Sequence, residues 1–392
     1  MVKVILDNPK QTGQQSEMVS FPITKYKETY ERLNVIGIGS ATERDCRVRE
    51  IVEGLPILKR LEESCVNVDE LDYLAKRLDS FDQREIAKFQ GAAVSYGYDS
   101  ISDLINLTFS CQEVTIIQDF RDLKAIGRDH YLDIYGGATE EELKTLDSLK
   151  CALSLILNDT GSITPYGVIY ENGMELSQLY SGKQFPEYDY DCESVLVVAM
   201  NKRSELGSSE AVTWFYLPME KCQIERAKFR ADISRCEDMQ IQYIRSEFPA
   251  GLDTLLASSG LDLELLNELC VSFKALDECE CKKLPAVLQM ADPLDIFQVR
   301  NLIEQLELFG FFPGISTPEE YGRHMIIESG HYEYDSELEE FYDFKKYGEQ
   351  RITNECGMFT NQGYISYNGF LSVEEIMAGS NSERMDMTMG GM

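Results

Sequence analysis

The sequence predicts an α+β protein made of two tandem units, each a small mixed sheet followed by a helical part, in an elongated, modular architecture that ends in an acidic C-terminal module. Three observations predict this class. Strand-like runs precede helical patterns in the first third of the chain, the same order recurs further along, and carboxylates concentrate near the C-terminus. Strands followed by runs of helices are typical of α+β domains.

The first unit begins with short apolar strands and continues into amphipathic helices. Val68, Leu71, Leu74, Ala75 and Leu78 lie on one helical stripe, the pattern of an amphipathic helix. A serine at position 100 is placed to cap a further helix. The expected strands are 2–6, 17–23 and 47–53, and the expected helices are 24–33, 55–62, 68–78, 82–96, 100–107 and 120–131.

The second unit repeats this order, with strands at 193–200, 211–217 and 239–245, a helix at 219–230 and helices from about 252 onward. A single offset of 195 residues also aligns identical residues. It pairs Leu71 with Leu266, Leu74 with Leu269, Ile101 with Ile296, Asn106-Leu107 with Asn301-Leu302, and Gly127-Arg128 with Gly322-Arg323. Two leucine-rich helical regions could match in part by chance, but the Asn-Leu and Gly-Arg matches favour a tandem duplication.

The expected division of the chain follows from this repeat. It comprises a first α+β repeat (1–135), a linker helix (136–162), a second repeat (163–316), an acidic module (317–378) and a flexible tail (379–392). We expect one strand at 163–170 and a hairpin turn at Asn172-Gly173, because this residue pair is frequent in type I′ turns.

The chain is strongly acidic. It has 68 acidic and 37 basic residues, a formal net charge of −31. Residues 1–160 hold 28 acids and 19 bases, which leaves 40 and 18 for residues 161–392. The electrostatic field of this negative charge opposes binding to nucleic acid or to an anionic membrane, so a basic protein partner is expected. No segment has signal-peptide or membrane-span character, and the 11 cysteines are scattered, which favours a cytoplasmic protein with reduced thiols.

Residues for catalysis or metal binding are sparse. His324 and His331 lie two helical turns apart, but Gly330 is expected to end the helix before His331, and no cysteine is near. The run Ile36-Gly-Ile-Gly-Ser40 lacks the third glycine of a dinucleotide-binding fingerprint. We therefore expect no catalytic residue, metal or cofactor.

The acidic module carries the candidate binding surface. Between Glu333 and Asp343 it has six carboxylates and no basic residue, and Leu338, Phe341, Tyr342 and Phe344 are expected to give it a buried face. The candidate partner-binding residues are Glu319, Glu320, Glu328, Glu333, Asp335, Glu337, Glu339, Glu340, Asp343 and Glu349. One interpretation is a solvated face that confers solubility. The other is a helical surface that occupies the Lys/Arg sites of a DNA-binding enzyme, because carboxylates at i, i+3 and i+4 recur at about 5–6 Å.

The C-terminal motifs favour the second interpretation. Tyr321-Gly322-Arg323, Glu328-Ser329-Gly330, the run 338–348 ending in Tyr347-Gly348, and Phe359-Thr360 before a strand at 363–365 resemble the C-terminal part of the ArdA antirestriction proteins. The resemblance implies a modular, acidic DNA mimic that inhibits type I restriction-modification enzymes, is carried on mobile elements and forms a homodimer.

Two other readings remain open. The chain could be a non-catalytic acidic scaffold or regulatory protein of a mobile element that binds another basic protein. It could also be a hydrolase with an unrecognised carboxylate pair, although general acid/base work needs carboxyls in dissimilar, partly buried environments.

Overall fold

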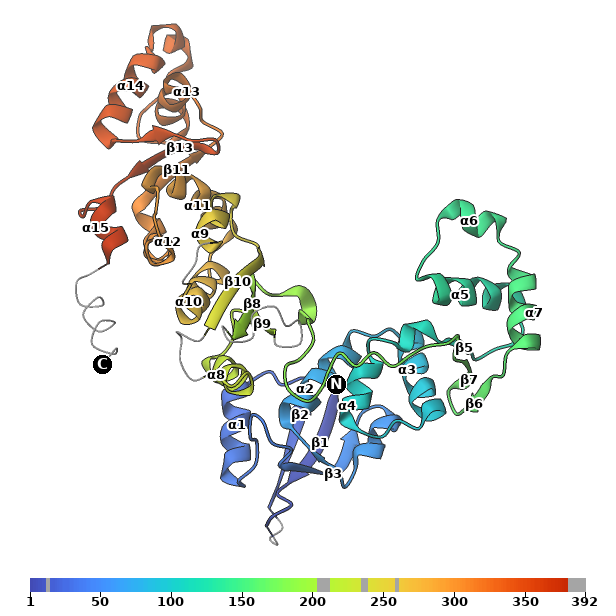
Figure 1. The fold of residues 1–392 in the computed structure, drawn as a ribbon. Helices are drawn as coiled ribbons and strands as arrows, with labels where there is room; N and C mark the ends of the chain where they lie inside the picture. Colours follow the sequence, from blue (N-terminus) through green and yellow to red (C-terminus); the bar gives the residue numbers. More distant parts are fainter. Residues whose placement is uncertain (12–14, 203–211, 234–238, 258–260, 380–392) are drawn as a thin grey trace. The chain divides into compact units, whose positions relative to one another are not determined.

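The computed structural model describes the chain except residues 12–14, 203–211, 234–238, 258–260 and 380–392, which include most of the expected tail (Figure 1). The α+β class is confirmed, since helices and small antiparallel sheets follow one another along the chain. Two compact units divide it. The first holds residues 1–193, 201–214 and 220–239, and the second holds residues 194–200, 215–219 and 240–392.

The first unit opens with a four-stranded antiparallel sheet of order β2-β1-β3-β4. Val4 of the inner strand β1 lies opposite Val19 on one side and Ile51 on the other. Alternate β1 residues are buried, as the period of two along a strand requires. The strands are β1 (Val2–Asp7), β2 (Ser16–Phe21), β3 (Cys46–Glu53) and β4 (Cys65–Val66), with α1 (Tyr26–Val35) and the 3-10 helix η1 (Pro56–Leu61) between them.

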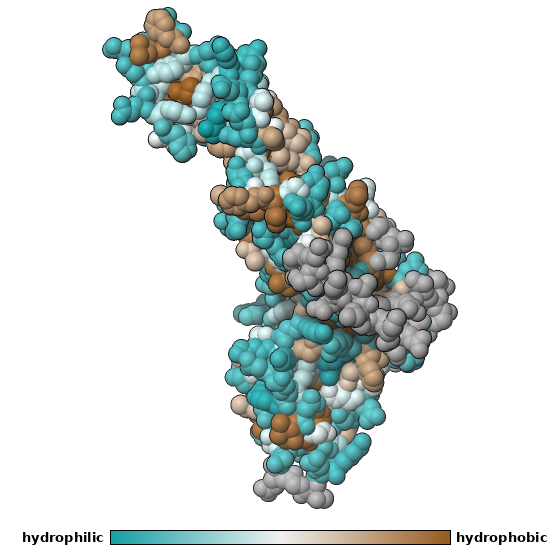
Figure 2. All heavy atoms as spheres, turned by 90° about the vertical axis from the view of Figure 1, so that its left-hand side faces the viewer, coloured by the Kyte–Doolittle hydropathy of each residue, from teal (hydrophilic) through white to brown (hydrophobic). Residues whose placement is uncertain are grey.

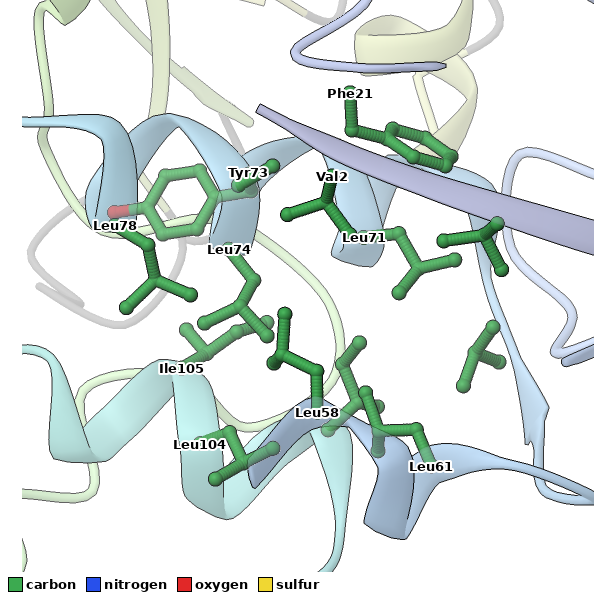
Figure 3. Packing of buried hydrophobic residues seen from close by; sticks show 14 of the residues in the cluster. Val2, Phe21, Leu58, Leu61, Leu71, Tyr73, Leu74, Leu78, Leu104 and Ile105 are labelled. Atoms are coloured by element: carbon green, nitrogen blue, oxygen red, sulfur yellow. The ribbon is translucent and has the colours of Figure 1, made fainter. Parts of the chain in front are cut away.

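Three helices follow this sheet, α2 (Val68–Asp79), α3 (Gln83–Tyr96) and α4 (Ile101–Leu107), of which α2 packs against β2 and α4 packs against α2 and α3. Each begins at a polar cap, because the side chains of Asn67, Asp82 and Ser100 accept hydrogen bonds from free backbone N–H groups of the first turn. Ser100 is the cap that the sequence predicted, and the other two caps lie within one residue of the expected helix starts. Figure 3 shows leucines of α2 and α4 meeting Leu58 and Leu61 of η1 and Val2 of β1. These side chains form one continuous core.

The first unit continues through a second, smaller sheet of order β5-β7-β6. Its elements are the 3-10 helix η2 (Cys111–Glu113), β5 (Thr115–Ile117), α5 (Leu123–Tyr135), α6 (Glu140–Thr145), α7 (Ser148–Asn158), β6 (Ser162–Thr164) and β7 (Gly167–Tyr170). We call residues 115–170 the first module. The expected linker 136–162 lies inside it: α7 packs against α5, and β7 pairs with β5.

Three local expectations in this region were wrong. The linker helix expected within 136–162 is two helices, because the Asp147 side chain accepts a hydrogen bond from the Lys150 backbone (3.1 Å) and starts a new helix. The single strand expected at 163–170 is a hairpin that turns at Pro165-Tyr166. The Asn172-Gly173 pair does not join two strands. Its Asn172 amide instead donates to the Glu113 carbonyl oxygen (2.7 Å).

Helix α8 (Lys221–Arg230) also belongs to the first unit and is held there by charge. Arg226 donates to both carboxylate oxygens of Asp69 at 3.0–3.2 Å, and Arg230 donates to the same carboxylate at 2.5 Å. The guanidinium of Arg226 also lies 4.0 Å from the ring centroid of Tyr30. Asp69 and both arginines are largely buried, so the contact is shielded from solvent.

The second unit begins at a three-stranded sheet of order β10-β8-β9 and continues through helices into a C-terminal sheet of order β11-β13-β12. Its helices and strands, with the 3-10 helix η3 that precedes them, are η3 (Tyr190–Cys192), β8 (Leu196–Lys202), β9 (Thr213–Leu217), β10 (Met239–Ser246), η7 (Ala250–Leu252), α9 (Asp253–Leu256), α10 (Leu263–Lys274), α11 (Glu278–Ala291), α12 (Ile296–Ile303), η8 (Leu306–Leu308), β11 (Phe309–Pro313), α13 (Pro318–Arg323), the π-helix η9 (His324–Glu328), η10 (Ser336–Phe341), α14 (Phe344–Glu355), β12 (Met358–Phe359), β13 (Gly363–Tyr367) and α15 (Val373–Ala378).

The order of elements recurs along the chain at nearly constant spacing. Helices α2, α3 and α4 begin at residues 68, 83 and 101, and α10, α11 and α12 begin at 263, 278 and 296, each 195 residues later. The strand orders β2-β1-β3 and β5-β7-β6 correspond to β9-β8-β10 and β11-β13-β12. This recurrence is what the expected tandem duplication requires, and common descent of the two halves stays a prediction.

Matched side chains recur with the elements. The buried Asn106 donates to the Tyr180 carbonyl oxygen (3.0 Å), and the buried Asn301 donates to that of Met377 (3.1 Å). Thr164 donates to the Gly167 carbonyl oxygen (2.7 Å) within the β6–β7 hairpin. Thr360 makes the same bond to Gly363 (2.8 Å) in the β12–β13 hairpin.

Candidate partner-binding module

The acidic run, residues 333–343, lies in a small module of residues 309–367, which we call the second module. Helices α13 and α14 cross at two glycines and pack beside the β11-β13-β12 sheet. A Cβ at Gly322 would lie 2.0 Å from the Phe344 carbonyl oxygen, and one at Gly348 would lie 1.8 Å from that of Pro318. The two Tyr-Gly motifs of the sequence therefore serve the helix crossing. Because β11 starts at Phe309, the sheet begins before the expected boundary at 317.

The centre of this module is aromatic. The rings of Tyr321 and Tyr364 lie 4.1 Å apart, and that of Phe312 lies 5.3 Å from Tyr321. Both tyrosines donate to the carboxylate of Glu355, at 2.6 and 3.2 Å, and Arg351 pairs with it. Burial, together with this carboxylate, raises the pKa of both tyrosine hydroxyls. Sequence reasoning missed Glu355, which serves the fold; its spacing of four from Arg351 was the available signal.

Three of the ten candidate carboxylates cap helices. Glu320 closes the capping box of α13 by accepting from the backbone N–H groups of Ser316 (2.8 Å) and Thr317 (3.1 Å). These hydrogen bonds lower the pKa of Glu320. Asp335 accepts from the Glu337 backbone (2.9 Å), and Asp343 accepts from the Lys346 backbone (3.0 Å). All three side chains contribute to local structure, so their charges are only partly available to a partner.

Two further candidates form side-chain pairs. Glu328 lies 2.9 Å from the Nδ1 atom of His324. Glu339 accepts from the Tyr334 hydroxyl (2.8 Å) and pairs with Arg323, and these contacts lower the pKa of Glu339. Glu339 is half-buried, whereas the other nine candidates are exposed. Its ion pair with Arg323 connects η10 to α13.

The other five are exposed, and the described part of the chain offers none of them a side-chain hydrogen bond or ion pair. They are Glu319, Glu333, Glu337, Glu340 and Glu349. Glu337 and Glu340 are three residues apart on the 3-10 helix η10, so they share one side of it, about 6 Å apart along the axis. Only part of the predicted site is thus free to contact another molecule.

The expected apolar face of this run is only partly buried. Phe344 is buried and Tyr342 is half-buried, but Leu338 is 47% exposed and Phe341 is 79% exposed. The prediction was wrong for these two because the segment forms a short 3-10 helix of period three, which does not gather positions 338, 341, 342 and 344 on one side. Figure 2 likewise shows small groups of hydrophobic residues among hydrophilic ones on the face it presents.

His130 belongs to the first unit, and His324 and His331 belong to the second. The π-helix ends at Glu328 and Gly330 has a φ of +71°, so the helix stops before His331, as expected. His130 is buried in α5, and its Nδ1 atom lies 2.9 Å from Thr115 Oγ1. Within the described residues, no group of three or more His, Cys, Asp or Glu side chains is arranged to hold a metal ion. Cys46, Cys111 and Cys270 are buried, and burial raises the pKa of each thiol, to about 12 for Cys111.

Comparison with known proteins gives no family for this chain: no protein-family model and no curated protein sequence matches it. In the described ranges, every helix is too short or too polar to cross a membrane.

Proposed function

We propose that the protein is an antirestriction protein that binds type I restriction-modification enzymes as an acidic DNA mimic, without catalysis. The observation that carries the proposal is the exposure of Glu333, Glu337 and Glu340 in a segment with six carboxylates and no basic residue. None of these three side chains has a polar partner within the described residues. Their charges are therefore available to the Lys and Arg side chains that line a DNA-binding cleft.

Spacing and rigidity support the proposal. The rise of about 6 Å between Glu337 and Glu340 is comparable with the separation of neighbouring phosphates along a DNA strand. The segment that carries them is held within η10 by the ion pair of Glu339 with Arg323, and at its C-terminal end by the Asp343 cap of α14. A held surface loses less conformational entropy on binding than a disordered acidic tail.

The experiment measures affinity for a purified type I modification complex over a salt series. The variant Glu333→Gln/Glu337→Gln/Glu340→Gln removes three free charges. Because each exposed contact contributes about 1 kcal/mol or less, we expect the triple variant to bind about ten- to a hundredfold more weakly at low salt, and each single variant to bind almost as the wild type does. Wild-type affinity should fall as salt rises, and duplex DNA should displace the protein.

The matched control is Glu31→Gln/Glu50→Gln/Glu225→Gln, which removes three exposed charges from the first unit. We expect this control to bind nearly as the wild type does. Equal loss in both triple variants would indicate that net charge alone acts. If the Glu333/Glu337/Glu340 variant kept wild-type affinity, and affinity did not change with salt concentration, the DNA-mimic proposal would be contradicted. Failure of the wild type to bind the complex, with capture of another basic protein, would instead favour the acidic regulatory protein.

A further inference from the structure

Helix η10 has three rows of side chains, because residues three apart are eclipsed on a 3-10 helix. One row holds Ser336 and Glu339, and Glu339 bonds inward to Arg323 and Tyr334. The second row holds the free carboxylates Glu337 and Glu340. The third holds Leu338 and Phe341, which are 47% and 79% exposed. An apolar row therefore lies beside an acidic row on the outer side of the helix.

The fold does not require this apolar row. Neither side chain belongs to the core of the second module, which is centred on Tyr321, Met325 and Tyr364. The first module has the same helix–segment–helix order, and its segment 136–147 exposes no large hydrophobic side chain. Leaving a phenylalanine in water forgoes about 2 kcal/mol of burial. These two residues are thus available to a partner.

Charge restricts what can cover them. Residues 333–343 hold six acids and no base. An anionic membrane, a nucleic acid or an acidic protein would be repelled. An apolar side chain encircled by charge is the arrangement of an interface hot spot, in which an anchor enters a dry pocket and the polar rim pairs around it.

We propose that Leu338 and Phe341 are the apolar anchor of the binding surface, and that they enter an apolar pocket bordered by Lys and Arg side chains on the basic partner. This inference rests on the proposed function and adds to it. The partner is recognised by a protein pocket as well as by charge, so the surface discriminates among enzymes that all bind DNA.

The experiment uses the full chain and the same type I modification complex. The variant Leu338→Ala/Phe341→Ala should bind about tenfold or more weakly. The loss should be the same at every salt concentration, because apolar contacts are not screened, so its plot of log affinity against log salt should run parallel to that of the wild type. The carboxylate triple variant should instead have a shallower slope.

The control is Leu294→Ala, which truncates a leucine outside the module that is 77% exposed, close to the exposure of Phe341; it should bind as the wild type does. Circular dichroism and thermal unfolding should show both variants folded. If the double variant bound with wild-type affinity, the anchor role of Leu338 and Phe341 would be wrong, but the proposed function would not be affected. A loss confined to low salt would also overturn the anchor role, since that would indicate a charge effect. Absence of wild-type binding at any salt would overturn both.

Discussion

Gly322 and Gly348 face each other with no side chain between them. A Cβ at Gly322 would lie 3.0 Å from the Gly348 nitrogen, and a Cβ at Gly348 would lie 3.1 Å from the Gly322 nitrogen. Gly127 of α5 lies in the same way against α7, where its Cβ would be 1.7 Å from the Ser148 carbonyl oxygen. Gly127 and Gly322 are 195 residues apart, so each module depends on a glycine at the equivalent helix crossing.

The first prediction follows from this crossing. Gly348→Ala should force α13 and α14 apart, because the added methyl would meet backbone and not a flexible side chain. We expect the free energy of unfolding of the second module to fall by about 3 kcal/mol, which is the upper end of the usual cost of overpacking. Hydrogen exchange of amides in the second module would measure it. The control Gly251→Ala adds a methyl into open space and should change little. A silent Gly348→Ala would contradict the close crossing.

The second prediction concerns the carboxylate that holds α8. Asp69→Ala leaves Arg226 and Arg230 without their shared partner in a largely buried site. Removing one partner of a buried ion pair costs about 3–5 kcal/mol. Chemical denaturation should show this loss in the first unit. Asp119→Ala, which removes the exposed pair with Arg121, should be close to neutral. Equal small effects would mean that α8 does not depend on Asp69.

The third prediction is a pH dependence. Burial lowers the pKa of His130, against the smaller opposing effect of Asp133 and Asp159. Below the unfolded-state value of about 6.5, the unfolded chain binds this proton more readily than the folded protein does. The free energy of unfolding should therefore fall as pH drops from about 6.5 through the lower folded-state pKa. Urea titrations of wild type and His130→Gln should diverge in that window. The exposed His331→Gln variant should follow the wild type.

The fourth prediction uses the recurrence itself. Leu149, Leu153 and Leu157 are exposed on α7, and the positions 196 residues later on α14 are Lys345, Glu349 and Thr353. Because the second module folds with polar residues there, Leu149→Lys/Leu153→Glu/Leu157→Thr should shift the melting temperature only slightly. Leu155→Ala, at a buried position on the same helix, should cost about 2–5 kcal/mol. A large loss in the triple variant would show that the leucine stripe is covered in the protein.

Much of the fold was predictable because local patterns set it. The α2 stripe, the start expected at residue 82 and the Ser100 cap located helices to within a residue or so. Expectations failed where a side chain competed with the backbone, as at Asp147, or where a hairpin turned inside an apolar run, as at Pro165-Tyr166. Periodicity alone does not resolve such breaks.

The candidate site was predictable as a region and not as a set of residues. The sequence by itself determined the excess of carboxylates at 333–343 and the two Tyr-Gly motifs, since charge and residue identity need no fold. Only the tertiary structure decided which carboxylates are free. Glu339 is engaged because α13 brings Arg323 beside η10, and Glu337 and Glu340 are free because a 3-10 helix turns them outward. It also decided that Leu338 and Phe341 are exposed, because burial depends on which surfaces the chain brings together and not on the hydrophobicity of a residue alone.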